Sequence, residues 1–119
     1  MNTLNKKSIK NLRKSLDFLA DELGDVPLQQ VIVLLRVAEG ELYNEATDGQ
    51  TMAKQCGVSA SAISRHLSAL GEWSWLKRPG AEMVLATRGF EDRRKLVLNL
   101  TPKGKIFLNK LLKIAGLLE

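Results

Sequence analysis

Six small or polar side chains between residues 59 and 68 are suited to hydrogen bonding with a polar partner. Helical spacing places them on one face: Ser59, Ala60, Ser61, Ser64, Arg65 and Ser68. Short side chains, hydroxyl groups and a single arginine allow such a face to approach the base edges in the major groove of DNA. The pattern favours a DNA-reading helix, and the alternative is an ordinary helical hairpin with a solvated face.

The segment 48–70 contains the elements that would position this face. Asp48 and Ser59 can each cap a helix, and Gly57 suits a left-handed turn between the two helices. Apolar residues recur at helical spacing on the side expected to be buried: Met52, Ala53, Cys56, Val58, Ile63, Leu67 and Leu70. Two short helices joined by a tight turn form a helix-turn-helix.

Catalysis and metal binding find little support in the residue types. His66 is the only histidine and Cys56 the only cysteine, so no Cys/His pair or metal-ligand cluster is available. We therefore expect no enzyme, no cofactor and no metal site. His66 is expected at the helix surface or at a phosphate, and Cys56 in the core.

A β-hairpin is predicted over residues 82–100. Two apolar stretches, 82–88 and 94–100, flank a charged tip. This arrangement would gather four basic residues around one acid: Arg88, Arg93, Arg94 and Lys95, with Asp92. The preceding residues 71–80 lack periodicity and are predicted to be a loop with irregular pairing, which Trp73 and Trp75 would anchor to the body of the protein.

Both ends of the chain are predicted to be helical. Residues 4–23 would form a helix that Gly24 ends, and Thr101 would cap a last helix. Each helix carries a narrow apolar seam: Ile9, Leu12, Leu16, Leu19 and Leu23 in the first, and Phe107, Leu111, Ile114 and Leu118 in the last. Such seams need a partner helix, either each other or a second subunit, and we expect them to support dimerisation.

Residues 27–39 are apolar around most of the helical circumference, so they are expected to form the central buried helix. Asp25 is expected to cap this helix and Gly40 to end it. The fold class is then mainly α with a small β-hairpin. Its 119 residues suit one domain, a winged helix-turn-helix at 27–100 flanked by terminal helices at 1–24 and 101–119.

Charge is unevenly distributed along the chain. The net charge is +5, and residues 51–113 hold twelve basic residues against four acids, whereas residues 15–50 hold eight acids and only Arg36. A basic face on the reading unit is expected for a polyanionic partner. A lone cysteine and the lack of a signal peptide or membrane-spanning run indicate a soluble, cytoplasmic protein without membrane contact.

From Met52 to about Leu108 the sequence resembles the MarR family of bacterial winged-helix transcription regulators. The resemblance rests on Met-Ala-Lys-Gln-Cys-Gly-Val-Ser at 52–59, Ile-Ser-Arg-His-Leu at 63–67 and Glu-Asp-Arg-Arg-Lys-Leu-Val-Leu-Asn-Leu-Thr-Pro-Lys-Gly at 91–104. It implies that Arg94 reaches the minor groove, that Asp92 orients the wing arginines and that the helix starting after Ser59 enters the major groove. It also implies a homodimer that binds double-stranded DNA, most simply as a repressor.

Two features depart from the family pattern. The loop at 71–82 is longer than usual, and the family commonly has a longer helical tail after the last helix. No effector pocket can be assigned to residues. Arg65 suits a guanine or a phosphate equally well. The alternative function is a winged-helix module for protein–protein contact, in which the basic wing would have no evident purpose.

Overall fold

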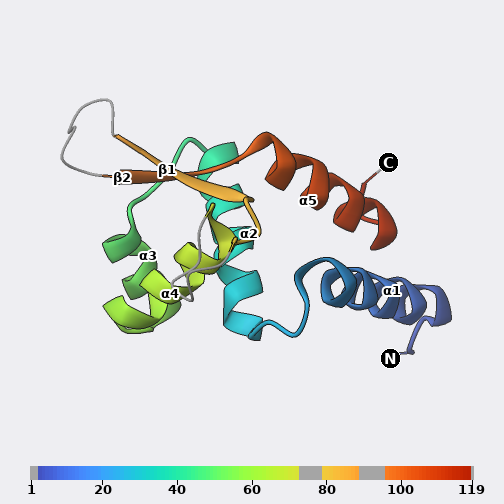
Figure 1. Cartoon of the computed structure of the whole chain (residues 1–119). Coiled ribbons are helices and arrows are strands. Elements are labelled where there is room, and N and C mark those ends of the chain that lie inside the picture. The colour runs from blue at the N-terminus through green and yellow to red at the C-terminus, as the bar shows by residue number, and fades with distance from the viewer. Residues whose placement is uncertain (1–2, 73–78, 89–95, 119) are drawn as a thin grey trace. The chain divides into compact units, whose positions relative to one another are not determined.

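A computed structural model describes residues 3–72, 79–88 and 96–118 of the chain. Within these residues the elements follow one another as α1 (Lys6–Leu23), α2 (Leu28–Leu42), α3 (Gly49–Cys56), α4 (Ala60–Leu70), β1 (Val84–Arg88), β2 (Leu96–Leu100) and α5 (Pro102–Ile114) (Figure 1). The predicted fold class is confirmed: the described residues are mainly helical, with one antiparallel hairpin between α4 and α5.

The chain divides into two compact units. One is Pro27–Gly104, which holds the helix-turn-helix and the hairpin; the other is formed by Met1–Val26 together with Lys105–Glu119. The boundary falls inside α5, between Gly104 and Lys105. We call Pro27–Gly104 the winged-helix unit and the other part the terminal-helix unit.

Helix α2 is the centre of the winged-helix unit, as its apolar circumference predicted. It packs against α3, α4 and β2. Val33, Leu34 and Val37 of α2 are almost fully buried, as are Met52 of α3 and Leu70 of α4. Burial of this kind contributes about 1.5–3 kcal/mol for each large aliphatic side chain, so α2 provides the surface on which the helix-turn-helix is held.

Both predicted ends of α2 are wrong. Pro27, with extended backbone and no side-chain cap, precedes the helix in place of Asp25, and the helix continues through Gly40 to Leu42. Gly40 does not end the helix but allows the backbone at Glu45 to lie close to it. The Gly40 carbonyl accepts a hydrogen bond from the Glu45 amide at 2.7 Å. A β-carbon at Gly40 would lie 3.2 Å from the Glu45 carbonyl oxygen. The connection to α3 therefore folds back closely against the last turn of α2.

The hairpin pairs β1 with β2 in antiparallel register, from Val84 opposite Leu100 to Arg88 opposite Leu96. Val84, Leu98 and Leu100 are buried, so one face of the hairpin packs on the unit. Strand β1 is shorter than predicted. Before β1, Glu82 has a φ of 58°, and this left-handed backbone interrupts the extended conformation.

Residues 80–83 pair with the end of α4 through their backbone. The amides of Ala81 and Met83 donate to the carbonyls of Ala69 and Leu70 at 2.8 Å each, and the Glu82 amide donates to Gly71 at 2.9 Å. The irregular pairing predicted for this region is thus present in its described part. Gly80 allows the close approach, because a β-carbon there would overlap the Gly71 carbonyl oxygen.

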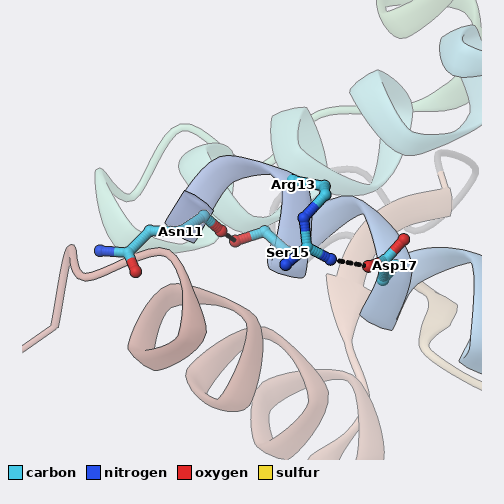
Figure 2. A network of polar contacts seen from close by, with 4 residues as sticks. All are labelled: Asn11, Arg13, Ser15 and Asp17. Carbon is cyan, nitrogen blue, oxygen red and sulfur yellow. Dashed lines mark hydrogen bonds and ion pairs between the residues drawn. The ribbon is translucent and has the colours of Figure 1, made fainter. Parts of the chain in front are cut away.

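The terminal-helix unit is held together by α1 and the part of α5 that follows Gly104. Phe18 stacks on Phe107 with ring centroids 5.2 Å apart, and Leu19, Leu111 and Ser15 are buried. Ser15 Oγ donates to the Asn11 carbonyl within α1 at 2.7 Å (Figure 2). Asn5 caps α1 by accepting from the Ser8 amide, and Gly24, with φ 77°, ends it.

The two predicted seams are only partly buried within the terminal-helix unit. In α1, Leu19 is buried but Ile9, Leu12 and Leu16 are exposed, because the stacking of Phe18 turns a neighbouring face of the helix inward. In α5, Phe107 and Leu111 are buried and Ile114 is half-buried. Leu118 lies beyond the helix, which ends at Ile114 before Gly116 takes a φ of 75°, so the predicted helical position of Leu118 is wrong.

Candidate nucleic-acid interface

Three predicted residues fix the ends of the helices in the helix-turn-helix. Gly57 adopts a left-handed conformation, φ 68° and ψ 33°, and ends α3. Ser59 Oγ then accepts from the Ala62 amide at 3.1 Å and caps α4, while Asp48 caps α3 by accepting from the Thr51 amide at 2.7 Å. These predictions are confirmed, and the caps fix where each helix begins.

The inward side of the helix-turn-helix determines which side of α4 faces outward. Ile63 and Leu70 of α4 are buried against Met52 and Ala53 of α3 and the central helix, and Leu67 is half-buried. Because residues three and four apart share a helix face, burial of these positions leaves the opposite side of α4 in contact with solvent.

The outward side of α4 is the small, polar face that the sequence predicted. Ala60, Ser61, Ser64 and Arg65 are exposed, as is the capping Ser59, whereas Ser68 is half-buried. The hydroxyl oxygens of Ser59 and Ser61 lie 3.3 Å apart. The structure therefore brings five of the six predicted residues to one accessible surface and turns Ser68 partly inward.

A shallow hollow of about 440 Å³ lies beside this face. It is lined by Gly49, Gln50, Ala60, Ile63, Ser64 and Leu67. Two of these residues, Gly49 and Gln50, come from the start of α3 and are not among the site residues predicted from the sequence. Their position directly after the cap Asp48 was the available signal, since a capped first turn lies at the exposed end of a helix.

His66 has a different environment from the one predicted. It is half-buried, and its Nδ1 lies 3.3 Å from Oε1 of Gln30, a residue of α2 that is itself buried. This hydrogen bond joins α4 to the central helix α2. The predicted contact of His66 with a phosphate stays a prediction.

The wing is described only in part. Arg88 ends β1, where it is paired in register with Leu96. Asp92, Arg93, Arg94 and Lys95 lie outside the described residues, as do Trp73 and Trp75. The proposed roles of these side chains therefore stay predictions.

The described residues contain neither a candidate metal-binding cluster nor a candidate membrane-spanning helix. No group of three His, Cys, Asp or Glu side chains in residues 3–72, 79–88 and 96–118 could hold a metal ion. In the same ranges no helix combines the length and apolar character that a bilayer crossing needs. Cys56, the only cysteine, is half-buried at the end of α3.

Comparison with solved structures identifies close likenesses of fold, although no family model and no curated protein sequence matches the chain. YusO of Bacillus subtilis aligns with a TM-score of 0.63 and 19% identity over 91% of this chain and 67% of that one. The transcriptional repressor CouR, bound to a 23-mer DNA duplex, aligns with a TM-score of 0.62 and 23% identity over 91% of this chain and 66% of its own.

MarR itself aligns with a TM-score of 0.58 and 25% identity, over 89% of this chain and 70% of MarR. The chain thus spans about two thirds of the length of these similar structures. The order of the elements, the capped helix-turn-helix followed by a hairpin, and the likeness over most of the chain agree: this chain has a MarR-like winged-helix fold.

Proposed function

We propose that this protein is a transcriptional regulator that binds double-stranded DNA in a sequence-specific manner. The observation that carries the proposal is the outward face of α4, on which Ser61, Ser64 and Arg65 are exposed at the side opposite the buried Ile63. A capped helix with short polar side chains can enter the major groove, where each base pair presents a distinct set of donors and acceptors. The DNA duplex bound by the similar CouR supports the same assignment.

Helix α4 would recognise the base sequence, and the wing would add contacts that strengthen binding to DNA. Serine hydroxyls donate to or accept from base edges, and the Arg65 guanidinium can donate two hydrogen bonds to a guanine or contact a phosphate. The wing would place Arg94 in the minor groove, whose negative potential attracts arginine, and Asp92 would orient the arginines. Arg88, Arg93 and Lys95 would contact phosphates.

The regulator would act as a homodimer. Two copies would present two α4 helices about 34 Å apart, one turn of DNA, so that each enters a successive major groove of a near-palindromic site. Repression by blocking access to the site is the simplest consequence of such binding. The role is one of binding, with no reaction assigned to the protein and no cofactor required.

A salt titration of duplex binding tests the proposal. Affinity for genomic DNA fragments, measured by fluorescence anisotropy, should fall linearly on logarithmic axes as salt increases, because phosphate contacts release counterions. Arg94→Ala should reduce the slope by about one. Arg65→Ala should cost about 1–3 kcal/mol on a preferred duplex if Arg65 reads a base, and should weaken all duplexes alike if it holds a phosphate.

Lys110→Ala is the matched control, since it removes an exposed positive charge from α5 outside the proposed interface. It should leave both the slope and the affinity close to those of the parent protein. A salt slope near zero, or no binding to any genomic fragment, would contradict the regulator and favour a winged-helix module for protein–protein contact.

A further inference from the structure

The shallow hollow beside the outward face of α4 has a mainly apolar lining. All six of the residues around it are uncharged, and only two have polar side chains: Gly49, Gln50, Ala60, Ile63, Ser64 and Leu67. A charged group that leaves water needs a charged or hydrogen-bonding partner, whereas an apolar group gains free energy when it leaves water. The lining therefore favours an apolar group as the occupant.

The hollow is open because α3 has a glycine where its first turn approaches α4. Gly49 does not have a positive φ, so its backbone conformation does not require glycine. A β-carbon at Gly49 would lie 3.4 Å from Leu67 Cδ1, which shows how near α3 comes to this part of α4. Ile63, the most deeply buried of the lining residues, is 3% exposed. A larger side chain at position 49 would extend toward Leu67 and narrow the hollow.

The hollow is continuous with the face of α4 that we propose reads DNA. Ala60 and Ser64 line the hollow and are exposed, and the exposed Ser61 and Arg65 follow them directly in the helix. When the second helix of a helix-turn-helix lies in the major groove, the first helix crosses the sugar–phosphate backbone. A hollow between the start of α3 and α4 then faces the base edges that lie next to the backbone.

Thymine carries the only methyl group on the major-groove edges of the four bases. The other groups that distinguish the bases there are ring nitrogens, carbonyl oxygens and amino groups, all of which form hydrogen bonds. The methyl group is attached to C5, on the side of the pyrimidine that faces its own sugar–phosphate strand. It therefore matches the hollow both in its apolar character and in its position next to the backbone.

We propose that this hollow binds the C5 methyl group of a thymine, so that Gly49, Ala60 and Leu67 select thymine over cytosine at one position of the DNA site. The inference rests on the proposed function and specifies one base group that the outward face of α4 recognises. It also adds α3 to the elements that determine sequence preference, through a residue that has no side chain.

Replacement of single thymines by deoxyuridine tests the proposal, because deoxyuridine lacks only the C5 methyl group. The probe is a duplex that the full chain selects from a random pool, and fluorescence anisotropy measures its affinity. We expect one position at which the replacement lowers the affinity about fourfold, the effect of one buried methyl group. At that position 5-methylcytosine should be preferred to cytosine by a similar factor, because it has the methyl group without the other groups of thymine.

Gly49→Ala tests the same contact from the side of the protein. The added β-carbon occupies part of the hollow near Leu67, so the ratio of affinities for the thymine and deoxyuridine duplexes should fall toward one. Thr51→Ala is the matched control, because Thr51 is exposed and lies about 200° around α3 from Gly49. This control should leave the ratio at its parent value.

A selected site in which no thymine replacement lowers the affinity would overturn the inference, and so would an unchanged ratio in Gly49→Ala. Loss of all duplex binding by Gly49→Ala would also overturn it, because one added methyl group leaves the phosphate contacts in place. The salt titration separates this inference from the proposed function. A steep salt slope without a methyl effect contradicts only the role of the hollow, whereas a slope near zero contradicts both.

Discussion

His66 links α4 to the central helix α2. It follows the exposed Arg65 in α4, and its Nδ1 lies 3.3 Å from Oε1 of Gln30 in α2, 36 residues earlier in the chain. Gln30 is 7% exposed, so its amide needs a hydrogen-bond partner inside the protein. A bond at this position resists rotation of α4 about its own axis, and that rotation determines the direction in which Arg65 points.

We expect Gln30→Leu to destabilise the protein by about 1–3 kcal/mol, because it leaves the imidazole nitrogen without its partner. The same change should weaken binding to a preferred duplex and leave the salt slope unchanged, since no phosphate contact is lost. Chemical denaturation measures the first effect and anisotropy at several salt concentrations the second.

Substituting His66 with Asn or with Gln distinguishes a role in positioning α4 from a loss of packing. Asn carries its amide nitrogen near the position of Nδ1, whereas Gln carries it near Nε2. His66→Asn should therefore retain most of the duplex affinity and His66→Gln should not. Equal affinities for these two variants would show that the bond to Gln30 does not position α4.

At the scale of elements, the start of α5 is fastened to the segment before β1. Thr101 Oγ1 donates to the Glu82 carbonyl at 2.6 Å and accepts from the Gly104 amide at 2.9 Å, and the Thr101 amide donates to Met83. Gly104 lies directly against this segment, because a β-carbon there would overlap backbone atoms of Met83. The hairpin and α5 therefore share one tightly packed junction.

Gly104→Ala should destabilise the winged-helix unit by more than about 2 kcal/mol, since the neighbouring atoms are backbone and have little room to move. Gly49→Ala is the matched control in the first turn of α3. Its β-carbon would meet Leu67 Cδ1 at an ordinary 3.4 Å, so its effect should stay within about 1 kcal/mol. Urea denaturation of the two variants measures the difference, and equal stabilities would show that the junction at Met83 is not tightly packed.

Elements whose ends depend on local chemistry were predictable from the sequence. Asp48, Ser59 and Thr101 cap helices as predicted, because a capping side chain bonds to an amide three residues away. Gly57 likewise forms the turn that its freedom at positive φ allows. The polar outward face of α4 followed from these local features together with the spacing of its buried residues.

Features set by distant residues were not predictable. The face of α1 that packs depends on Phe107, which stacks on Phe18 from far along the chain. Helix α2 continues through Gly40, whose carbonyl accepts a hydrogen bond from the Glu45 amide. The order of residues alone does not reveal this contact. The bond between His66 and Gln30 is of the same kind, and helical periodicity gives no sign of it.

At the scale of the whole molecule, the proposed homodimer predicts the symmetry of the DNA site. Selection of bound duplexes from a random pool should yield two inverted half-sites whose centres are about ten base pairs apart, or a multiple of that. Sequencing of the selected pool reports both the half-site and its spacing. An asymmetric site without repetition would count against the homodimer.

Helix α5 runs without interruption from one unit into the other. It begins at Pro102 in the winged-helix unit, passes the boundary between Gly104 and Lys105 and ends at Ile114 in the terminal-helix unit. The second covalent connection is the short link after Gly24, whose φ is 77°. The polypeptide therefore crosses between the two units twice, once in the first turn of α5 and once in an irregular link, so a protease that cut only the link would leave both units in one covalent chain.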